Sequence, residues 1–485
     1  MITTGLKVLM VAAEMVPFAK TGGLADVIGA LPAALRALGH DVRVALPRYS
    51  RIDLQRFDLQ PALAPFAVPF DDTTIDAALL SGNAGDTPVY FVDNDRFFAR
   101  DGIYMYDDDA DRYIFFCRAV LEALRLLDWV PDVIHCHDWH TAIIPNWLKT
   151  LYRDDPLFQP IACVYTIHNL AYQGVFGHRV LEVAGVDEYA FEALPERPQV
   201  SEMVDFMSRG IFYADLISTV SETYAAEILD PAHGEGLDTL LRDRRERLFG
   251  VLNGIDVVRY DPATDLHIAA TYDADNLAGK ILCKAALQGQ HGLTATAQTP
   301  LIGIVSRLTD QKGFDLLAQI IEPLLRHHDV QFAILGTGDR RYHDLLSITR
   351  ARFPQQLSFA PTFNAAAAQQ IYAGADLLLM PSRSEPCGQS QMVAMRYGTI
   401  PIVRATGGLA DTVTDYDATA ESGDGFVFVP YEPLALFAAI VRAIEAYRHR
   451  ASWQRLITRA MAADHSWDAS ARRYVELYQK ALALR

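Results

Sequence analysis

Polar side chains and backbone groups suited to a phosphorylated, hydroxyl-rich ligand are concentrated between residues 381 and 413. A short apolar run at 375–380 precedes them and is typical of a buried parallel strand, and a helix is predicted from Gly388 to about Tyr397. Open α/β sheets bind ligands beyond the carboxyl ends of their strands, and helix N-termini favour phosphate. The residues predicted to hold the ligand are Glu385, Gly388, Gln389 and Ser390. A capped turn without a ligand is the alternative.

Two adjacent glycines with the same neighbours occur twice in the chain. The sequence Thr-Gly-Gly-Leu-Ala-Asp stands at 21–26 and again at 406–411, each time after an apolar strand pattern and at the start of a predicted helix. Paired glycines let the backbone approach a ligand closely and leave N–H groups free. The repeat predicts two similar α/β domains facing each other, although common descent without a shared ligand role would also explain it.

Two cations lie five residues apart where a strand gives way to a helix. Arg307 ends an apolar strand, and Lys312 precedes the glycine that opens the next helix. A diphosphate leaving group gains charge as its bond to a sugar breaks, and fixed cations would stabilise that charge more than the ground state. We therefore predict that both side chains act on a diphosphate; solvated surface cations are the alternative.

Further polar residues follow predicted strands in the first half of the chain. The strand at 132–136 delivers His137, Asp138 and Trp139, and the strand at 161–167 delivers His168. The two histidines at 137 and 140 lack a third spaced ligand, which argues against zinc. Trp139 offers a face to a sugar ring and Asp138 an acceptor for hydroxyls, with core packing of Trp139 left open. A neutral imidazole at 168 could donate to a sugar hydroxyl, or could be purely structural.

The order of predicted strands and helices indicates two doubly wound α/β domains. In the second half, strands at 301–306, 330–335, 357–360 and 375–380 alternate with helices, which demands a parallel sheet. The first half begins with a strand at 7–13, a loop in which Glu14 and Lys20 can reach a substrate, and a helix at 24–38. We place the domains at 1–250 and 251–464, followed by a C-terminal helical segment at 465–485.

Composition limits the classes of partner. The chain has 485 residues, 51% of them hydrophobic, and a formal net charge of −17, which disfavours nucleic acid and anionic membranes but does not repel a neutral ligand. No run approaches the roughly 20 apolar residues of a membrane span. Five scattered cysteines without a CxxC spacing are consistent with reduced thiols, and we expect a cytoplasmic protein.

Two motifs that could indicate other chemistry are incomplete. Asp107, Asp108 and Asp109 could hold a divalent cation on a diphosphate, but they do not follow a buried strand, so we interpret them as solvated and expect no metal. Gly336-Thr337-Gly338 is only a fragment of a dinucleotide fingerprint, so an NAD-dependent enzyme is poorly supported.

Six motifs occur in order over nearly the whole chain. They are Lys-Thr-Gly-Gly-Leu at 20–24, His-Asp-Trp-His at 137–140, Thr-Ile-His-Asn at 166–169, Asn-Gly-Ile-Asp at 253–256, Ser-Arg-Leu with Gln-Lys-Gly at 306–313, and Ser-Glu-Pro-Cys-Gly at 384–388. Together they resemble the motifs of bacterial glycogen synthases and plant starch synthases. The resemblance implies a GT-B fold of two Rossmann-like domains facing across a deep cleft. It also implies transfer of glucose from ADP-glucose to the non-reducing end of an α-1,4-glucan, with retention and without a cofactor.

The resemblance further implies a role for each matched residue. The catalytic residues would be His168, Arg307, Lys312 and Glu385. The donor-binding residues, mostly in the second domain, would be Lys20, Gly22, Gly23, Asp26, Asn253, Phe363, Cys387, Gly388, Gln389, Ser390, Thr406 and Gly407. The acceptor-binding residues, in the first domain, would be Glu14, His137, Asp138 and Trp139. The C-terminal helix would cross back onto the first domain.

Some positions depart from the family pattern, and other functions stay open. The family usually has Leu-Thr-Gln where Gln389-Ser390-Gln391 stand here, and the loop at 363–368 lacks a common acidic residue. A transferase using UDP-glucose or a small sugar acceptor is one alternative. A non-catalytic glucan-binding protein would have no need of Lys20, Arg307, Lys312 and Glu385 together, and a phosphorylase-like enzyme would need a lysine-bound pyridoxal phosphate, for which no signature is present. The sequence leaves the oligomeric state undetermined.

Overall fold

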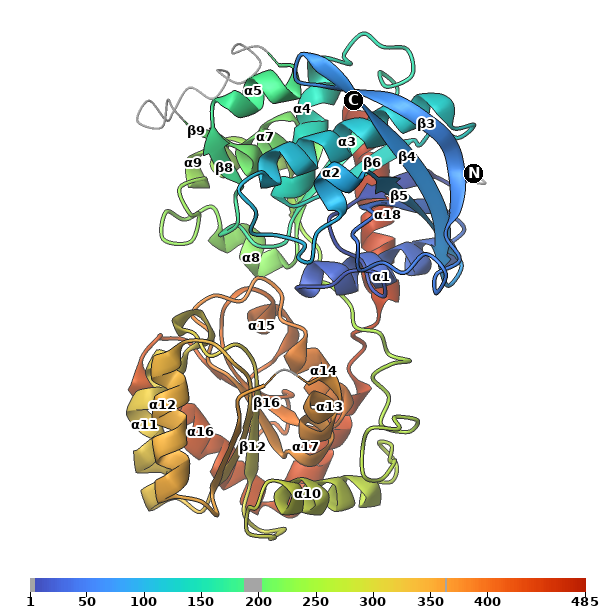
Figure 1. Cartoon of the computed structure of the whole chain (residues 1–485). Coiled ribbons are helices and arrows are strands. Elements are labelled where there is room, and N and C mark those ends of the chain that lie inside the picture. The colour runs from blue at the N-terminus through green and yellow to red at the C-terminus, as the bar shows by residue number, and fades with distance from the viewer. Residues whose placement is uncertain (1–4, 187–202, 363) are drawn as a thin grey trace. The chain divides into compact units, whose positions relative to one another are not determined.

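The computed structural model describes residues 5–186, 203–362 and 364–485. The chain divides into two compact units (Figure 1). The first comprises residues 1–220, 225–251 and 467–485, and the second comprises residues 221–224 and 252–466. No helix among the described residues is both long and apolar enough to span a membrane.

The first unit is built on a nine-stranded sheet in the order β11-β10-β7-β6-β1-β2-β5-β4-β3. Its pairs are parallel except β3–β4 and β4–β5, which form an antiparallel layer at one edge. The strands are β1 (Lys7–Val11), β2 (Asp41–Pro47), β3 (Gln60–Phe70), β4 (Thr73–Ala84), β5 (Thr87–Asp93), β6 (Val133–His137), β7 (Ala162–Ile167), β10 (Leu216–Thr219) and β11 (Leu248–Gly250).

Helices cover this sheet and include the last one of the chain. Figure 1 shows α18 (Trp467–Leu484) among the elements of the first unit, where its Tyr474 and Tyr478 are buried and it packs against α1 and β7. The other elements are α1 (Gly23–Ala37), α2 (Asp95–Phe98), α3 (Asp109–Leu126), η1 (Trp139–Thr141), α4 (Ile143–Lys149), β8 (Val175–Gly177), α5 (Arg179–Ala184), β9 (Met203–Asp205), α7 (Phe206–Tyr213), α9 (Asp238–Asp243) and η3 (Arg245–Arg247). A short helix, α8 (Glu222–Glu227), begins at the boundary with residues of the second unit.

The second unit has a six-stranded, fully parallel sheet in the order β14-β13-β12-β15-β16-β17. Its strands are β12 (Leu301–Val305), β13 (Gln331–Leu335), β14 (Leu357–Ala360), β15 (Leu377–Met380), β16 (Ile400–Arg404) and β17 (Phe426–Phe428). The strand order reverses between β12 and β15, and doubly wound sheets bind ligands beyond the strand ends at such a switch point.

Helices lie on both faces of this sheet, as the alternation in the sequence predicts. Figure 1 shows α11, α12 and α16 on one face and α13 and α14 on the other. The helices are α10 (Ala278–Gln290), η4 (Asp310–Lys312), α11 (Phe314–His327), α12 (Arg340–Arg352), α13 (Ala365–Gly374), α14 (Ser390–Arg396), α15 (Gly407–Thr412), α16 (Pro433–Arg448) and α17 (Arg450–Ala462).

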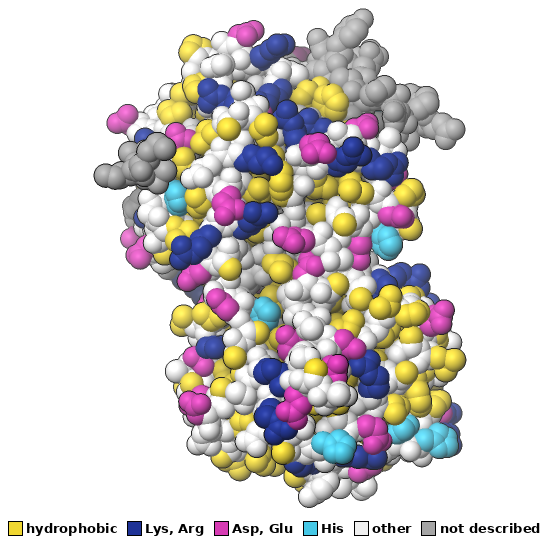
Figure 2. Space-filling view, turned by 180° about the vertical axis from the view of Figure 1, so that it is seen from behind, with side chains coloured by type: hydrophobic (Ala, Val, Ile, Leu, Met, Phe, Trp, Pro, Cys, Tyr) yellow, Lys and Arg dark blue, Asp and Glu magenta, His cyan; other side chains and the backbone are white. Residues whose placement is uncertain are grey.

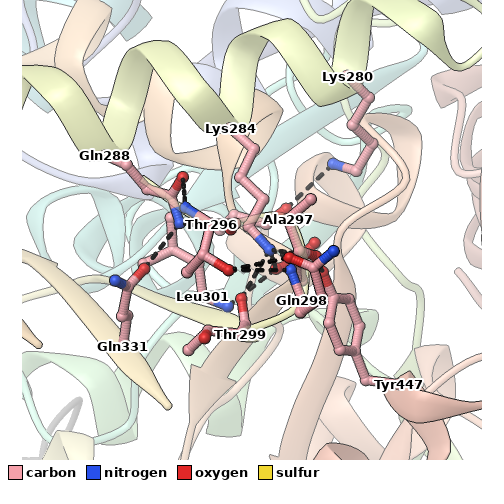
Figure 3. Close-up of polar contacts among 12 residues, drawn as sticks. Lys280, Lys284, Gln288, Thr296, Ala297, Gln298, Thr299, Leu301, Gln331 and Tyr447 are labelled. Atoms are coloured by element: carbon pink, nitrogen blue, oxygen red, sulfur yellow. Dashed lines mark hydrogen bonds and ion pairs between the residues drawn. The ribbon is translucent and has the colours of Figure 1, made fainter. Parts of the chain in front are cut away.

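Two buried lysines of α10 bind groups on other elements of the second unit (Figure 3). The Nζ of Lys284 lies 2.7 Å from the carboxylate of Asp376 and donates to the carbonyl of Thr299 and the hydroxyl of Tyr447. Lys280 donates to three backbone carbonyls and to the Oγ1 of Thr399. Because a buried ammonium group is tolerated only when its hydrogen bonds are satisfied, these contacts assign both lysines to the framework of the fold.

The surface carries both signs of charge. On the face shown in Figure 2, basic and acidic side chains are interspersed over each unit, and no single basic field dominates the visible surface.

Candidate active site

The central contact in the second unit is an ion pair between residues far apart in the sequence. Lys312 ends η4 after β12, and Glu385 lies in the loop after β15; their Nζ and Oε2 atoms are 2.5 Å apart. Ser382 donates to the same carboxylate oxygen at 3.0 Å. Gly313, with φ of +80°, lets the two loops meet, because a Cβ there would lie 2.1 Å from the carbonyl oxygen of Pro381. The switch point of the sheet thus brings together a cation and an anion that the sequence places 73 positions apart.

Arg307 lies in the same region but does not join that pair. Its guanidinium is exposed and donates to the side chain of Gln311 at 3.3 Å. A cation that is exposed and weakly held can turn toward a ligand at small cost. The structure therefore places one predicted cation in a fixed ion pair and leaves the other at the surface.

The loop between β15 and α14, together with the first residue of α14, carries four more predicted donor residues. Gly388 adopts φ of +70°, and Gln389 precedes α14 without capping it through its side chain. The hydroxyl of Ser390 accepts a hydrogen bond from Tyr372 at 3.0 Å. Burial raises the pKa of the Cys387 thiol to about 12, so this side chain is a neutral thiol and not a nucleophilic thiolate.

Asn253 lies beside Cys387 and is buried, and its Oδ1 has no hydrogen-bond partner within the described part of the chain. A buried polar atom left in this way is suited to a ligand donor. Phe363, predicted to contact the adenine, lies outside the described residues.

The two glycine pairs have opposite surroundings. A Cβ on Gly407 would lie 2.1 Å from the carbonyl oxygen of Glu385, and one on Gly408 would lie 2.0 Å from that of Cys387, whereas nothing lies within 4 Å of a Cβ on Gly22 or Gly23. The second pair therefore packs against the loop that carries Glu385, with Thr406 buried beside it, and only the first pair faces open space.

In the first unit, Glu14 organises the glycine loop. Its carboxylate is buried and accepts hydrogen bonds from the backbone N–H groups of Thr21 and Gly22 and from the hydroxyl of Tyr104. Lys20, which is partly exposed, binds both oxygens of Asp26 at 2.6 Å. The N–H of Gly22 is thus already engaged, contrary to the expectation that the glycine pair leaves both amides free, because the nearby buried carboxylate needs donors.

The strand ends β6 and β7 bring the predicted polar residues of this unit together. The backbone N–H of His168 donates to the Oδ1 of Asp138 at 2.8 Å, and the Nε2 of His168 lies 3.0 Å from the Nδ1 of His137. Burial lowers the pKa of His168 to about 3, lowers that of His137, and raises that of Asp138 to about 7. Both imidazoles are therefore neutral near pH 7.

Trp139 is half-buried and packed within the unit. The centroids of its ring and that of His140 are 4.1 Å apart, and a Cβ on Gly174 would lie 2.5 Å from the nearest ring atoms of Trp139. Most of the Trp139 side chain is therefore packed against its neighbours, as the alternative of core packing predicts, and the rest of it is exposed.

One expectation about the acidic run was wrong. Asp109 is buried and pairs with the fully buried Arg112, and Asp108 pairs with Arg100 at 2.6 Å; only Asp107 is exposed. The reason is that α3 begins at Asp109, which places Arg112 one turn away. Across residues 5–186, 203–362 and 364–485, no three histidine, cysteine or carboxylate side chains are grouped as metal ligands.

Comparisons with known proteins decide the family. Residues 7–243 match the starch synthase catalytic domain, and residues 292–458 match the glycosyl transferases group 1 model. The chain is 48% identical to a glycogen synthase of Moorella thermoacetica, with 99% of this chain and 98% of the relative covered, and 46% identical to one of Desulforudis audaxviator, with 98% and 97% covered. This chain belongs to the glycogen synthase and starch synthase family.

Solved structures agree with this assignment. The catalytic domain of starch synthase IV from Arabidopsis thaliana, bound to ADP and acarbose, matches with a TM-score of 0.90 at 35% identity, covering 99% of this chain and 100% of that one. A sucrose-phosphate synthase from Thermosynechococcus elongatus, at 16% identity, shares the fold alone, with a TM-score of 0.59 and 99% of each chain covered. The GT-B fold and the family resemblance seen in the motifs are thereby confirmed.

Several residues of this family member hold the site yet carry no motif that would single them out. Ser221 donates to the carbonyl of Pro386 at 2.7 Å, and Thr223 binds the carboxylate of Asp411. Ser382, which binds Glu385, and Tyr104, which binds Glu14, likewise carry no sequence signal. Serine, threonine and tyrosine hydroxyls are too common in sequences for a single one to be noticed, and only their position in space shows what they bind.

Proposed function

We propose that this glucosyltransferase elongates glycogen by moving glucose from ADP-glucose to the non-reducing end of an α-1,4-glucan, with retention at the reacting carbon. Family membership over the whole chain supports glucosyl transfer in glycogen elongation. The observation that carries the chemistry is the ion pair of Lys312 and Glu385 at the switch point of the second sheet. A structural relative bound to ADP supports the choice of an adenine donor.

Lys312 and Arg307 would bind the donor diphosphate. In the present structure Glu385 compensates the charge of Lys312, so an arriving diphosphate finds the lysine already held in position. An ammonium group has three donors and can serve the carboxylate and a phosphate oxygen together. As the glycosidic bond breaks, negative charge grows on the ADP oxygen, and fixed cations there lower the barrier.

Glu385 would hold the glucose or balance positive charge, and it would not attack the sugar. Its Oε2 accepts hydrogen bonds from both Lys312 and Ser382, which lowers the nucleophilicity of that oxygen. Same-face displacement, in which the departing ADP oxygen guides the acceptor hydroxyl, then accounts for retention. No metal or cofactor enters this proposal, because side chains supply the charge that the diphosphate requires.

The first unit would provide the sugar and acceptor contacts. His168, neutral near pH 7, can donate a hydrogen bond to a sugar hydroxyl. Asp138 and the exposed part of Trp139 would contact the glucan, and the open glycine pair with Lys20 would approach the donor phosphates. Glu14, whose carboxylate is occupied, would act by holding that loop. We assign the acceptor to residues 1–250 and the donor to 251–464, and we propose a cytoplasmic location, supported by five buried free thiols.

The deciding experiment measures glucose incorporation into glycogen with ADP-glucose and UDP-glucose in parallel, with and without EDTA. We expect incorporation from ADP-glucose that survives EDTA, with α-1,4-linked product. Faster transfer from UDP-glucose would support the alternative donor. Glycogen binding without incorporation from either donor would indicate a glucan-binding protein, and loss of activity in EDTA that Mg²⁺ or Mn²⁺ restores would contradict the metal-free mechanism.

A further inference from the structure

A buried polar ladder crosses three neighbouring strands of the first unit. His135 and His137 alternate on β6, Thr166 lies on β7, and Ser218 lies on β10. Alternate residues of a strand share a face, so these side chains line the same side of the sheet. All four are buried. The ladder ends at His168, the residue that directly follows β7 and to which we assign a sugar contact.

Two histidines of the ladder have different partners. His135 uses both of its ring nitrogens, with Nδ1 2.9 Å from the hydroxyl of Tyr478 on α18 and Nε2 2.6 Å from the hydroxyl of Thr166. His137 uses one, since its Nδ1 lies 3.0 Å from the Nε2 of His168. The ring of His135 contacts that of His137, with centroids 4.0 Å apart and ring planes 38° to each other, and makes no hydrogen bond to it.

The contact between His137 and His168 can form in only two ways. Both rings are neutral, because burial lowers the pKa of each. A neutral imidazole has one N–H donor and one acceptor nitrogen. Either His137 donates from Nδ1 to the Nε2 of His168, or His168 donates from Nε2 to the Nδ1 of His137. The first arrangement leaves His168 with an N–H at Nδ1, and the second leaves it with a bare acceptor there.

The other nitrogen of His137 distinguishes the two arrangements. Its Nε2 is buried and has no hydrogen-bond partner among the residues that the structure describes. If His137 accepted at Nδ1, its proton would sit on Nε2 as an orphaned buried donor. Buried N–H groups without a partner are rarer and more costly than unpaired acceptors. The proton therefore belongs on Nδ1, pointing at His168.

We propose that His137 is a positioning residue that fixes the tautomer of His168, so that the Nδ1–H of His168 is held as a hydrogen-bond donor for an oxygen of the transferred sugar. The backbone of His168 is fixed separately by Asp138. His137 thus does not contact the acceptor, the role that its motif suggested, but acts through its neighbour. This inference rests on the proposed function for the identity of the sugar and on the fold alone for the tautomer.

The tautomer itself can be observed without any assay. Neutron diffraction on crystals of the perdeuterated full-length protein near pH 7 locates the deuterons on both rings. We expect deuterium on the Nδ1 of His137 and on the Nδ1 of His168. Deuterium on the Nε2 of either ring would overturn the proposal, whatever the enzyme's substrate. Failure of the enzyme to use ADP-glucose, by contrast, would overturn the proposed function and leave this assignment intact.

Two variants test the consequence for catalysis. In His137→Asn the side-chain amide occupies the place of Nδ1 and can still donate, whereas His137→Leu cannot. Loss of one hydrogen bond predicts that His137→Leu lowers kcat on the order of tenfold with a smaller change in donor KM, while His137→Asn stays within about threefold of the parent. His291→Leu removes a half-buried histidine bonded to Ser358 in the second unit and serves as the control, with unchanged kcat. Normal turnover in His137→Leu, or equal loss in the leucine and asparagine variants, would contradict the proposed role.

Discussion

At the scale of single residues, the proposed site depends on charges that the fold holds in place before a substrate binds. Lys312 is held by its ion pair with Glu385. The guanidinium of Arg307 is exposed, and its hydrogen bond is to the side chain of Gln311. A fixed charge needs no reorganisation during the reaction, and a mobile one must be ordered by the ligand. The two cations should therefore differ in how they affect binding and turnover.

Replacing Lys312 should slow the chemical step more than it weakens donor binding. We expect Lys312→Ala to lower kcat on the order of 10²-fold, the scale for loss of a preorganised stabilising group, and to raise donor KM less. Arg307→Ala should also lower kcat but raise donor KM by a larger factor than Lys312→Ala does. Steady-state kinetics check both, with Arg340→Ala, at a 93% exposed side chain of α12, as the control. Near-normal turnover with only weaker donor binding in Lys312→Ala would refute the assignment.

The charge of Glu385 should matter even when its shape is kept. Glu385→Gln preserves size and can still bond Ser382, but it removes the negative charge beside Lys312. If Glu385 balances charge, Glu385→Gln should lower the turnover rate. The parent enzyme should then form no covalent glucosyl intermediate at any stage of the reaction. Mass spectrometry of the parent enzyme during turnover provides the check, and a glucosyl ester trapped on Glu385 would establish it as the nucleophile instead.

At the scale of elements, identical glycine motifs perform different tasks. Gly408 sits at the start of α15 and touches the backbone of Cys387, so the loops after β15 and β16 form one packed structure. Gly23 sits at the start of α1 with open space around it. The stability of the fold should therefore depend on the second pair and not on the first.

Gly408→Ala should be destabilising and Gly23→Ala should not. The added methyl at 408 would lie 2.0 Å from a backbone oxygen, which must move, whereas nothing lies within 4 Å at 23. We expect Gly408→Ala to lower Tm by several degrees and Gly23→Ala to leave Tm within about 2 °C, because about 1 kcal/mol corresponds to roughly 2–4 °C for a unit of this size. Thermal unfolding followed by circular dichroism measures both. Equal Tm values for the two variants would mean that the contacts of Gly408 do not matter.

At the scale of the whole molecule, buried histidines tie the stability of the first unit to pH. Burial lowers the pKa values of four imidazoles below 6.5, those of His135, His137, His140 and His168. Their neutral forms stabilise the folded state above pH 6.5, and this contribution is lost as pH falls toward about 3, because the unfolded chain binds the protons. The pKa of Asp138 is raised to about 7, so the folded state binds its proton at a higher pH than the unfolded chain does. This single group therefore stabilises the folded state as pH falls and opposes the effect of the histidines.

The first unit should therefore lose stability between pH 6.5 and pH 4.5. Four histidines outweigh one carboxyl group, so the urea midpoint should fall steadily over this range. His140→Phe keeps an aromatic ring beside Tyr104 and Trp139. It should reduce the slope of the unfolding free energy against pH by about 1.4 kcal/mol per pH unit, the value for one proton. Urea titrations monitored by tryptophan fluorescence at several pH values test this. An unchanged slope in His140→Phe would show that this histidine is not kept neutral by the fold.

The sequence alone determined the family, the alternation of strands and helices, and which loops follow strand ends. These follow from local signals, namely apolar runs, glycine pairs and ordered motifs, that are readable along the chain. Tertiary structure decided which of those residues meet. Hydrogen bonds between Lys312 and Glu385, His137 and His168, or Glu14 and Tyr104 join positions 31 to 90 residues apart, and no local pattern encodes them. Burial sets the protonation of the histidines and gives the two glycine pairs different surroundings. It likewise depends on which parts of the chain pack against each residue.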